Sequence, residues 1–320
     1  MTTYTDVVSR DSFASNTNDP LVPDGVSAEV IQVATQSSAV MQLARRVTMP
    51  SKSQRIPVLS TLPSAYFVSG DTGLKQTSAA DWENLELVAE EIAVIVPIPE
   101  AYLDDAQVPI WNEVRPLIGQ AFGTLFDNAV LWGTNKPATW GAALSTSIEA
   151  SNNDFTEGVS GDDFAADLTY VGQAVAKDGH VVNGALAAPG LAWRLAGLRA
   201  TTGELVYQPS ASQFDGMPSL YGLRMSEVLN GAWDQDYTVI LGDWSKAIVG
   251  VRQDITYKVF TEGVISNDSN AVVLNLMQQD SVALRAVMRV AWAVADPVTP
   301  TSSQSDANTF AFGALVSQPT

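Results

Sequence analysis

The sequence has 320 residues, enough for one large domain or two modest ones, and 46% of them are apolar, which allows a substantial core. Only 16% of the residues are charged, which fits either a surface that partners cover or a large, core-rich monomer. The formal net charge of −18 excludes nucleic-acid binding through counterion release as the main task. A container that holds DNA without binding it stays compatible with this charge.

The absence of cysteine excludes disulfides, thiolate zinc sites and cysteine nucleophiles. No run of 18 apolar residues predicts a membrane span, and the N-terminus MTTYTDVVSRDSF lacks the basic and apolar regions of a signal peptide. We therefore expect a protein that is made and used in the cytosol and has no membrane partner.

The first 50 residues are predicted to form a polar arm followed by a helix. Residues 1–27 are too polar to fold alone and suit either a loose tail or an arm that orders on a neighbour. Residues 28–48 follow a helical period, and Pro50 ends this element. The densest basic spot of the chain, Arg45-Arg46, lies on the expected helix.

Two strands separated by a long polar stretch are predicted next. Residues 54–59 and 85–98 read as strands, and β-branched residues gather at the end of the second one. Residues 60–84 between them have no helical period, and loops beyond about 12–15 residues are usually functional or disordered. A long two-stranded flap also exposes backbone edges unless a partner covers them. We therefore interpret residues 60–84 as a docking arm.

The strongest helix signal covers residues 108–132. Pro109 suits the first helical position and Gly133 suits the stop, whereas Pro116 predicts a late start or a kink. The predicted apolar face consists of Trp111, Val114, Ile118, Ala121, Phe122, Leu125, Ala129 and Trp132.

The remaining sequence mixes helices and strands, which is typical of an α+β fold. We expect a Gly/Asn/Ser-rich connection at 134–161, a helix at 162–178, short alternating helices and strands at 182–250, strands at 251–264 and 272–296, and a loosely held tail after Pro297.

No pattern of catalytic or metal-ligating residues stands out, so we predict no enzyme, no cofactor and no metal site. The one histidine, His180, lies in a Lys-Asp-Gly-His turn and is expected to be exposed. The motifs G-x-S-x-G, H-E-x-x-H, G-x-G-x-x-G and the Walker P-loop are absent. The acidic pairs at 104–105 and 162–163 lie at helix starts, where the helix dipole stabilises them. Distant carboxylates that converge in space stay an open alternative.

The order of these elements resembles that of the major capsid proteins of tailed phages, which have the Hong Kong 97-type fold. The matching stretches cover most of residues 20–297. They are PLVPDGVSAEVIQVATQSSAVMQLARRVTMPSKSQRIPV, LELVAEEIAVIVPIPEAYLDDA, FDNAVLWG, APGLAWRLAGLRATTGELVYQP, YGLRMSEV, VILGDWSKAIVGVR and DSVALRAVMRVAWAVADP.

The resemblance implies an α+β Hong Kong 97-type capsid fold with an N-terminal arm, an extended β-hairpin loop, a peripheral domain with a long spine helix, and an axial domain. The implied segments are the N-terminal arm (1–27), the N-terminal helix (28–49), the extended loop (50–90), the peripheral domain with the spine helix (91–141), the axial domain (142–250), the return to the peripheral domain (251–297) and the C-terminal tail (298–320).

The resemblance also implies a subunit that assembles into hexamers and pentamers of an icosahedral shell around double-stranded DNA, which it encloses without specific binding. The resemblance implies scaffolding, portal and decoration proteins as further partners. It also implies that the protein is made in the host bacterial cytoplasm and is located in the virion capsid. The chain begins almost directly with the arm, so we expect a separate scaffolding protein or none. The candidate inter-subunit contact residues are Tyr66, Phe67, Lys75, Trp82, Arg45, Arg46, Asp19 and Val22.

Some members of this family join their subunits by a lysine–asparagine isopeptide bond that a glutamate assists. Lys75 lies in the matching loop, but the asparagine position falls near Val272 and the glutamate position near Gln279. Because Gln cannot take the lysine proton, we predict no autocatalytic crosslinking.

Three other classes of protein fit less well. An encapsulin-type shell of the same fold would begin with a cargo-docking helix, whereas this chain begins with a polar arm. A secreted carbohydrate-active enzyme would need a signal segment and a convergent pair of acids. A monomeric structural domain would leave the long flap unexplained.

Overall fold

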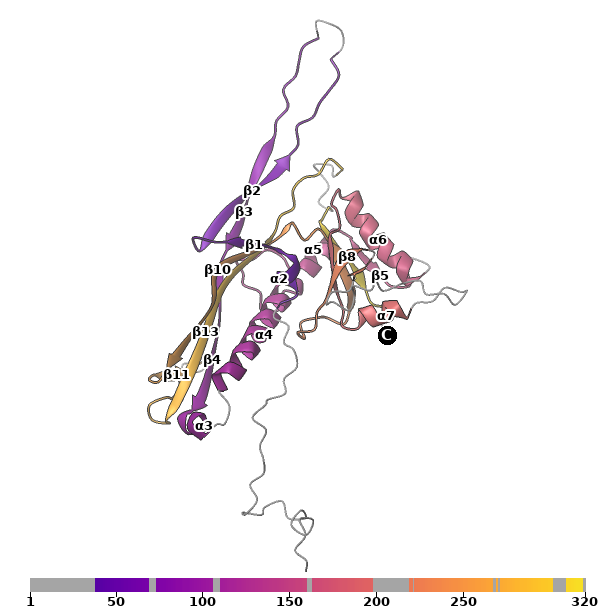
Figure 1. The fold of residues 1–320 in the computed structure, drawn as a ribbon. Helices are drawn as coiled ribbons and strands as arrows, with labels where there is room; N and C mark the ends of the chain where they lie inside the picture. Colours follow the sequence, from indigo (N-terminus) through magenta and orange to yellow (C-terminus); the bar gives the residue numbers. More distant parts are fainter. Residues whose placement is uncertain are drawn as a thin grey trace, which may run out of the picture.

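The structure is a computed structural model that describes residues 38–68, 73–105, 110–159, 163–197, 219–220, 222–266, 269, 271–301 and 309–318. A long four-stranded sheet with a helix along it forms one part, a six-stranded sheet with short helices forms the other, and a hairpin projects beyond both (Figure 1). The predicted α+β class is therefore confirmed.

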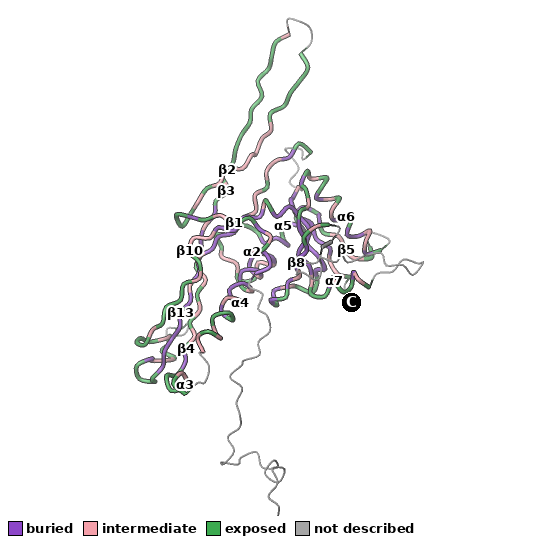
Figure 2. The backbone as a smooth tube through the Cα atoms, in the orientation of Figure 1, coloured by how far each residue is buried: buried purple, intermediate pink, exposed green. Residues whose placement is uncertain are grey.

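The four-stranded sheet is built around two long strands, β10 (Ala247–Phe260) and β13 (Ser281–Val294), which pair antiparallel. Strand β4 (Glu90–Pro99) adds antiparallel to β13, and β1 (Arg45–Thr48) adds parallel to β10. The first four residues of β10 are buried, and the strand becomes more exposed beyond the register shifts near residue 253. Strand β13 is largely buried at both of its ends, so of these two long strands only β10 is exposed at the far end of the ladder (Figure 2).

The long helix α4 (Ile110–Leu131) packs its buried side chains against this sheet. The ring of Phe126 meets Trp292 of β13 edge-on at a centroid distance of 6.2 Å, and it meets Trp140 at 5.8 Å. Gly133 ends the helix region in the left-handed conformation at φ 76°, as its position in the sequence predicts. Pro116 lies inside the helix, so the alternative of a late start is wrong.

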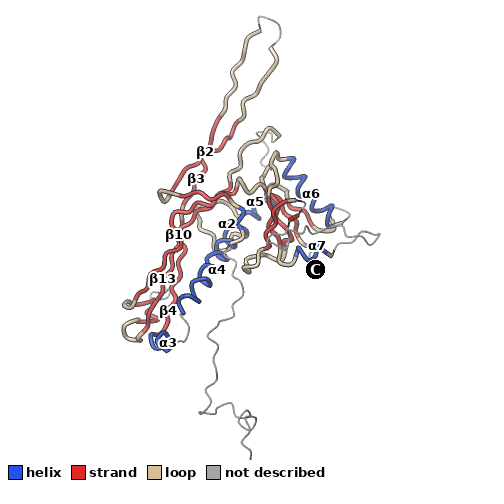
Figure 3. The backbone as a smooth tube through the Cα atoms, viewed as in Figure 1, coloured by secondary structure: helices blue, strands red, loops and turns tan. Residues whose placement is uncertain are grey.

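The six-stranded sheet has the order β5-β14-β9-β6-β8-β7. Its strands are β5 (Asp154–Thr156), β6 (Gly184–Ala187), β7 (Ser219–Leu220), β8 (Leu223–Glu227), β9 (Tyr237–Gly242) and β14 (Phe312–Val316). The helices around it are α5 (Leu144–Ala150), α6 (Phe164–Lys177) and α7 (Leu191–Ala196), as Figure 3 shows. Asp163 caps α6 by accepting a hydrogen bond from Ala166 N at 2.8 Å.

One hydrophobic core joins the two sheets. Strand β9 ends at Gly242 and β10 begins at Ala247, so four residues carry the chain from one sheet into the other. Trp244 in this turn is 2% exposed and packs edge-on against Phe312 of β14 at 5.0 Å. The same cluster of buried residues contains Phe126 and Trp292, so both sheets depend on it.

The remaining elements lie at the ends of the molecule. The hairpin of β2 (Ser53–Thr61) and β3 (Asp81–Val88) extends from one end of the long sheet. The opposite end carries α3 (Glu100–Asp105) and the small pair β11 (Val264–Ser266) and β12 (Val272–Asn275). No helix within the described part of the chain is long and apolar enough to cross a membrane.

Three predictions about secondary structure are wrong. The single strand expected over 85–98 is divided at Ala89 into β3 and β4, which belong to different sheets. The expected helix over 28–48 is limited to α2 (Val40–Leu43) among its described residues, and Arg45-Arg46 lie on strand β1. Pairing with β10 satisfies the backbone of β1 and overrides its helical period. The expected connection at 134–161 contains helix α5 and strand β5, and its residues 160 and 161 lie outside the described residues.

The expectations of a loose tail and of an exposed histidine are also wrong. Strand β14 lies between β5 and β9, and Phe312 and Ala314 are fully buried. His180 is 5% exposed because its amide closes the end of α6 by donating to Val175 O at 3.2 Å. Its Nε2 atom lies 3.6 Å from Asp296 Oδ1.

The junction of β9 and β14 gives a test of this packing. A Cβ atom built on Gly242 would lie 2.1 Å from Phe312 Cδ1 and 2.7 Å from Ala311 O, whereas one on Gly141 meets nothing within 4 Å. We expect Gly242→Ala to lower the free energy of unfolding by about 2 kcal/mol or more through overpacking, and Gly141→Ala to change it by less than about 0.5 kcal/mol. Urea unfolding of both variants measures this difference. Equal stabilities would contradict the close approach of the two strands.

Candidate inter-subunit surfaces

The projecting hairpin is paired at its base and unpaired at its tip. Strands β2 and β3 form cross-strand pairs from Ser53 with Val88 up to Thr61 with Asp81. Beyond this point, the described residues of 62–80 lie outside any strand. Across the tip, Ser64 N donates to Ser78 Oγ at 2.8 Å, and the Tyr66 hydroxyl contacts the backbone of Gln76. The tip is therefore held by a few polar contacts only.

The tip exposes large apolar side chains to solvent. Phe67 and Leu74 are 104% and 90% exposed, and Trp82 at the end of the paired region is 60% exposed. Side chains as exposed as Phe67 and Leu74 gain almost no packing from the described residues of their own chain. Because an exposed apolar patch marks a contact site, the tip is a candidate docking surface.

The structure brings together some of the predicted contact residues and separates others. Tyr66, Phe67 and Lys75 lie on the hairpin tip, and Trp82 lies where pairing begins. Arg45 and Arg46 lie on β1, away from the tip, although both are exposed. Asp19 and Val22 lie outside the described residues.

The far end of the long sheet carries a second apolar surface that the sequence did not single out. Val264, Val272, Val273 and Met277 in and after the β11–β12 pair are between 54% and 70% exposed. Their short apolar runs were interpreted as ordinary strand residues. Thus the two ends of the molecule, far apart in Figure 1, both present unpartnered apolar side chains.

A buried carboxylate fixes the point where the chain enters the described fold. Asp127 of α4 has no exposed surface and accepts hydrogen bonds from Ser38 Oγ at 2.5 Å, Ala39 N at 2.9 Å and Asn230 Nδ2 at 2.7 Å. Burial raises the pKa of Asp127 above its usual value of 3.8, and the hydrogen bonds oppose this rise. Ser38 and Ala39, which follow the first 37 residues of the sequence, are thereby held at the middle of the molecule.

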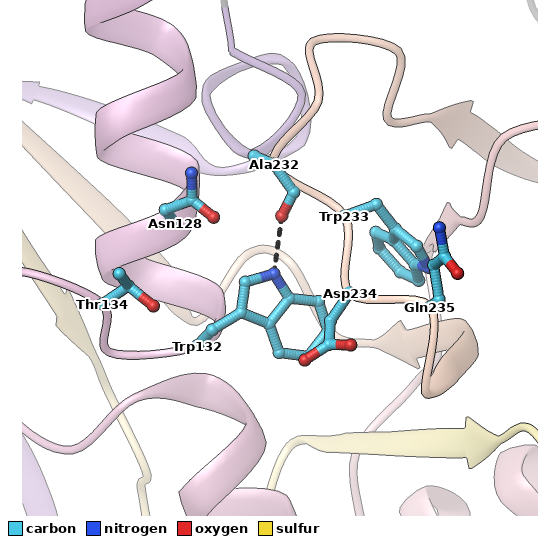
Figure 4. Close-up of a pocket in the computed structure, with 7 residues that line it drawn as sticks. All are labelled: Asn128, Trp132, Thr134, Ala232, Trp233, Asp234 and Gln235. Atoms are coloured by element: carbon cyan, nitrogen blue, oxygen red, sulfur yellow. Dashed lines mark hydrogen bonds between the residues drawn. The ribbon is translucent and has the colours of Figure 1, made fainter. Parts of the chain in front are cut away.

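Two adjoining grooves follow the outer side of α4. The first, about 440 Å³, lies between the end of α4 and the loop before β9, and Figure 4 shows its residues: Asn128, Trp132, Thr134, Ala232, Trp233, Asp234 and Gln235. The second, about 420 Å³, follows Leu117, Gln120, Ala121, Thr124, Leu125 and Asn128. Asn128 lines both, so the grooves are continuous. The prediction that Ala121 and Leu125 face the core is wrong, because both are exposed.

No catalytic or metal site is evident among the residues that the structure describes. They contain no group of three or more His, Cys, Asp or Glu side chains able to hold a metal ion. Of the predicted helix-start acids, Asp163 caps α6 with its carboxylate, whereas Asp104 and Asp105 are the last residues of α3, so the prediction for this pair is wrong. What the geometry offers is a set of contact surfaces at the periphery of a well-packed core.

The chain is similar in sequence and in fold to capsid proteins of phages. The sequence matches the phage capsid family over residues 18–299. The major capsid protein of Staphylococcus phage 80alpha is 30% identical over 307 residues, which cover 89% of this chain and 90% of that protein. A solved structure from Microbacterium phage Oxtober96 has a TM-score of 0.83 at 33% identity and covers 98% of this chain and 100% of that chain. One from Mycobacterium phage Adephagia has a TM-score of 0.82 at 32% identity, with coverage of 98% and 99%.

The fold and its projecting surfaces therefore define a structural subunit of a protein shell. The chain belongs to the phage capsid family, and its function is that of a major capsid protein. The resemblance found in the sequence is confirmed, and the comparisons favour it over an encapsulin-type shell or a carbohydrate-active enzyme.

The Asp127 cluster generates a stability prediction. At acidic pH the protonated carboxyl of Asp127 can still accept a hydrogen bond at each oxygen, whereas Asp127→Asn replaces one oxygen with an NH2 group that only donates, so we expect a loss of about 1–3 kcal/mol. Because the pKa of Asp127 is raised in the folded chain, its contribution is fully present below the unfolded value and is lost as pH rises through the raised value. The stability difference between the two proteins should therefore shrink toward neutral pH.

Urea unfolding of the isolated subunits across this pH range measures the effect. Asp104→Asn, which changes an exposed carboxylate on α3, is the matched control and should cost less than about 0.5 kcal/mol. A difference between Asp127 and its Asn variant that grows with pH would contradict the assignment.

Proposed function

We propose that this capsid protein assembles into hexamers and pentamers of an icosahedral shell around double-stranded DNA. The observation that carries the proposal is the hairpin tip, where Phe67 and Leu74 gain almost no packing from the part of the chain that the structure describes. In a shell of identical subunits, each copy presents one surface to a neighbour and receives a different one. Such heterologous contacts close into rings when the rotation between copies allows it.

We place the partner of the hairpin tip at the β11–β12 end of a neighbouring copy. Both surfaces are apolar and exposed, and they lie at opposite ends of one molecule, as a head-to-tail contact requires. The family resemblance supports this assignment, because it pairs the position of Lys75 with that of Val272 in another subunit. Ordering the tip costs about 1–2 kcal/mol per residue of backbone entropy, which contact with the neighbour offsets.

The two sheets support a division of the chain into a peripheral and an axial part. The long sheet with α4 corresponds to the proposed peripheral domain, and most of the six-stranded sheet comes from the proposed axial segment 142–250. The axial part also takes in β14, which the proposed tail boundary at 298 had left out. The axial parts of neighbouring copies would meet around the symmetry axes.

The remaining assignments concern chemistry, partners and location. The protein has no enzymatic activity and encloses DNA without specific binding, in keeping with its net charge of −18. Scaffolding, portal and decoration proteins are its other partners, and it is made in the host bacterial cytoplasm before it enters the virion. No autocatalytic crosslink forms, because a glutamine, Gln279, stands where a proton-accepting glutamate is needed.

A shortened hairpin tests the assembly role. Residues 62–80 can be replaced by Asn-Gly, which closes a two-residue turn between the paired Thr61 and Asp81 and leaves β2 and β3 intact. We expect a folded subunit with an unchanged circular dichroism spectrum that forms no closed shells in negative-stain electron microscopy.

A second variant keeps the length of the hairpin and removes only its exposed apolar side chains. The double change Phe67→Ser and Leu74→Ser should reduce the yield of shells at least about tenfold, since each buried large apolar side chain contributes roughly 1.5–3 kcal/mol. Shells of normal number and size from the shortened chain would overturn the proposal.

The crosslinking prediction is checked on a denaturing gel. Boiled mature particles should migrate as a single band at 34.1 kDa, and Lys75→Arg should give the same pattern. A ladder of covalent multimers that disappears in the Lys75→Arg particles would show that an isopeptide bond forms after all.

A further inference from the structure

In the groove at the end of α4, both tryptophan indole N–H groups already donate to backbone carbonyls, so only the faces of the rings are available to a ligand. Trp132 Nε1 donates to Ala232 O at 2.6 Å, as the dashed line in Figure 4 shows, and Trp233 Nε1 donates to Tyr237 O at 2.7 Å. The two indole rings stand at 85° with their centroids 5.6 Å apart. A ligand of this groove therefore gains from stacking and apolar contact, as proline-rich extended segments do in aromatic grooves.

The apolar surface continues from this groove along the helix. Leu117, Ala121 and Leu125 are spaced four residues apart on α4, and the two leucines are 47% and 38% exposed. From Leu117 to Trp132 the helix rises about 22 Å, which corresponds to about seven residues of extended chain. The surface thus suits a short extended segment with a proline-flanked apolar part.

The sequence contains two segments with prolines three residues apart. In the first, Pro297–Pro300, Val298 N donates to Leu59 O at 3.1 Å and Thr299 is 8% exposed, so this segment is already placed beside the hairpin base. The second is Pro20-Leu21-Val22-Pro23 in the proposed N-terminal arm. It has the required apolar side chains, and its prolines need no partner for a backbone N–H.

We propose that the continuous groove along α4 binds the Pro20–Pro23 segment from the arm of a neighbouring copy. This inference rests on the proposed function, in which arms order on adjacent subunits. The 14 residues from 24 to 37 link the segment to Ser38, which is fixed at Asp127. Fully extended they span about 46 Å, about twice the length of the groove along α4. Because each copy has one arm and one groove, the arms can fill every groove in a closed shell.

The charges around the segment predict how salt affects the contact. Asp19 and Asp24 flank the prolines, and Asp234 lies in the groove. These like charges repel, so raising the salt concentration screens the repulsion and should strengthen the contact. A contact that weakens with salt would indicate a different, charge-driven occupant.

The absence of cysteine allows an unambiguous trapping experiment. One full-length chain carries Val22→Cys and a second carries Gln235→Cys at the exposed rim of the groove. The two chains are assembled together and oxidised, and a disulfide forms only if their Cα atoms come within about 7 Å. We expect a covalent dimer on a non-reducing gel, absent when either chain is assembled alone, and more abundant at higher salt.

Matched variants separate this site from general proximity. Gln278→Cys, an exposed glutamine at the far end of the long sheet, should trap little or no dimer with Val22→Cys. Changing both Pro20 and Pro23 to Ser leaves the described fold untouched and should lower trapping by about fivefold or more, given the value of ring contacts.

Three results would overturn the inference. Equal trapping at positions 235 and 278 would show that the arm has no preferred groove. A Val22→Cys, Gln235→Cys double variant that closes only within one chain, at the 34.1 kDa position, would show that the arm folds back onto its own subunit. Intact shells without any trapped dimer would refute the groove alone, whereas wild-type chains that form no shells would refute the proposed function together with it.

Discussion

The packing of a single core between two sheets is the constraint on which the rest of this structure depends. Trp244 and Phe312 bring the six-stranded sheet into the same cluster as Phe126 and Trp292 of the long sheet and its helix. This core occupies the middle of the molecule, so segments that extend beyond it cannot contribute to it. The hairpin tip and the β11–β12 end keep apolar side chains exposed because they lie far from that core. Under the proposed function, their stabilising contacts come from other copies.

The elements that the sequence predicts best are those whose own periodicity determines them. Helix α4 combines a long apolar period with Gly133 at its end, and β13 alternates in burial between Leu284 and Val290. Strand β1 could not be predicted, because it exists through pairing with a strand about 200 residues later. Strand β14 was hidden by the polar, proline-containing stretch before it, although the sequence FAFGALV carries a strand signal. The buried position of His180 follows from the Asp-Gly-His ending of α6, in which Gly179 adopts φ 83°.

The candidate surfaces divide in the same way. The hairpin was predictable from length and polarity, since a 25-residue stretch that is mostly polar and lies between two strands has no place in a compact core. The groove along α4 was not, because apolar residues occur on several sides of this helix. Which side faces the core depends on where the sheet lies, and Leu125 and Ala121 turned out to face away from it. Likewise, Trp132 and Trp233 are 101 positions apart and meet only through the fold.

The start of the described chain is held in place by buried hydrogen bonds, whereas the hairpin tip extends away from the core, and a shell needs both features. Asp127 holds Ser38 and Ala39 by buried hydrogen bonds whose loss would leave a carboxylate unpaired in the core, so the starting point of the arm is well defined. The tip of the hairpin lacks any comparable anchor, and its direction is set by the paired strands below it.

A weak apolar contact at the end of such an extension gives little affinity between two free subunits. Once a ring has formed, however, each subunit is held on two sides, and every further contact becomes intramolecular with a high effective concentration. Contacts too weak to hold a dimer therefore suffice to hold a closed shell, which explains how a subunit can leave so much apolar surface uncovered and still assemble in an ordered way.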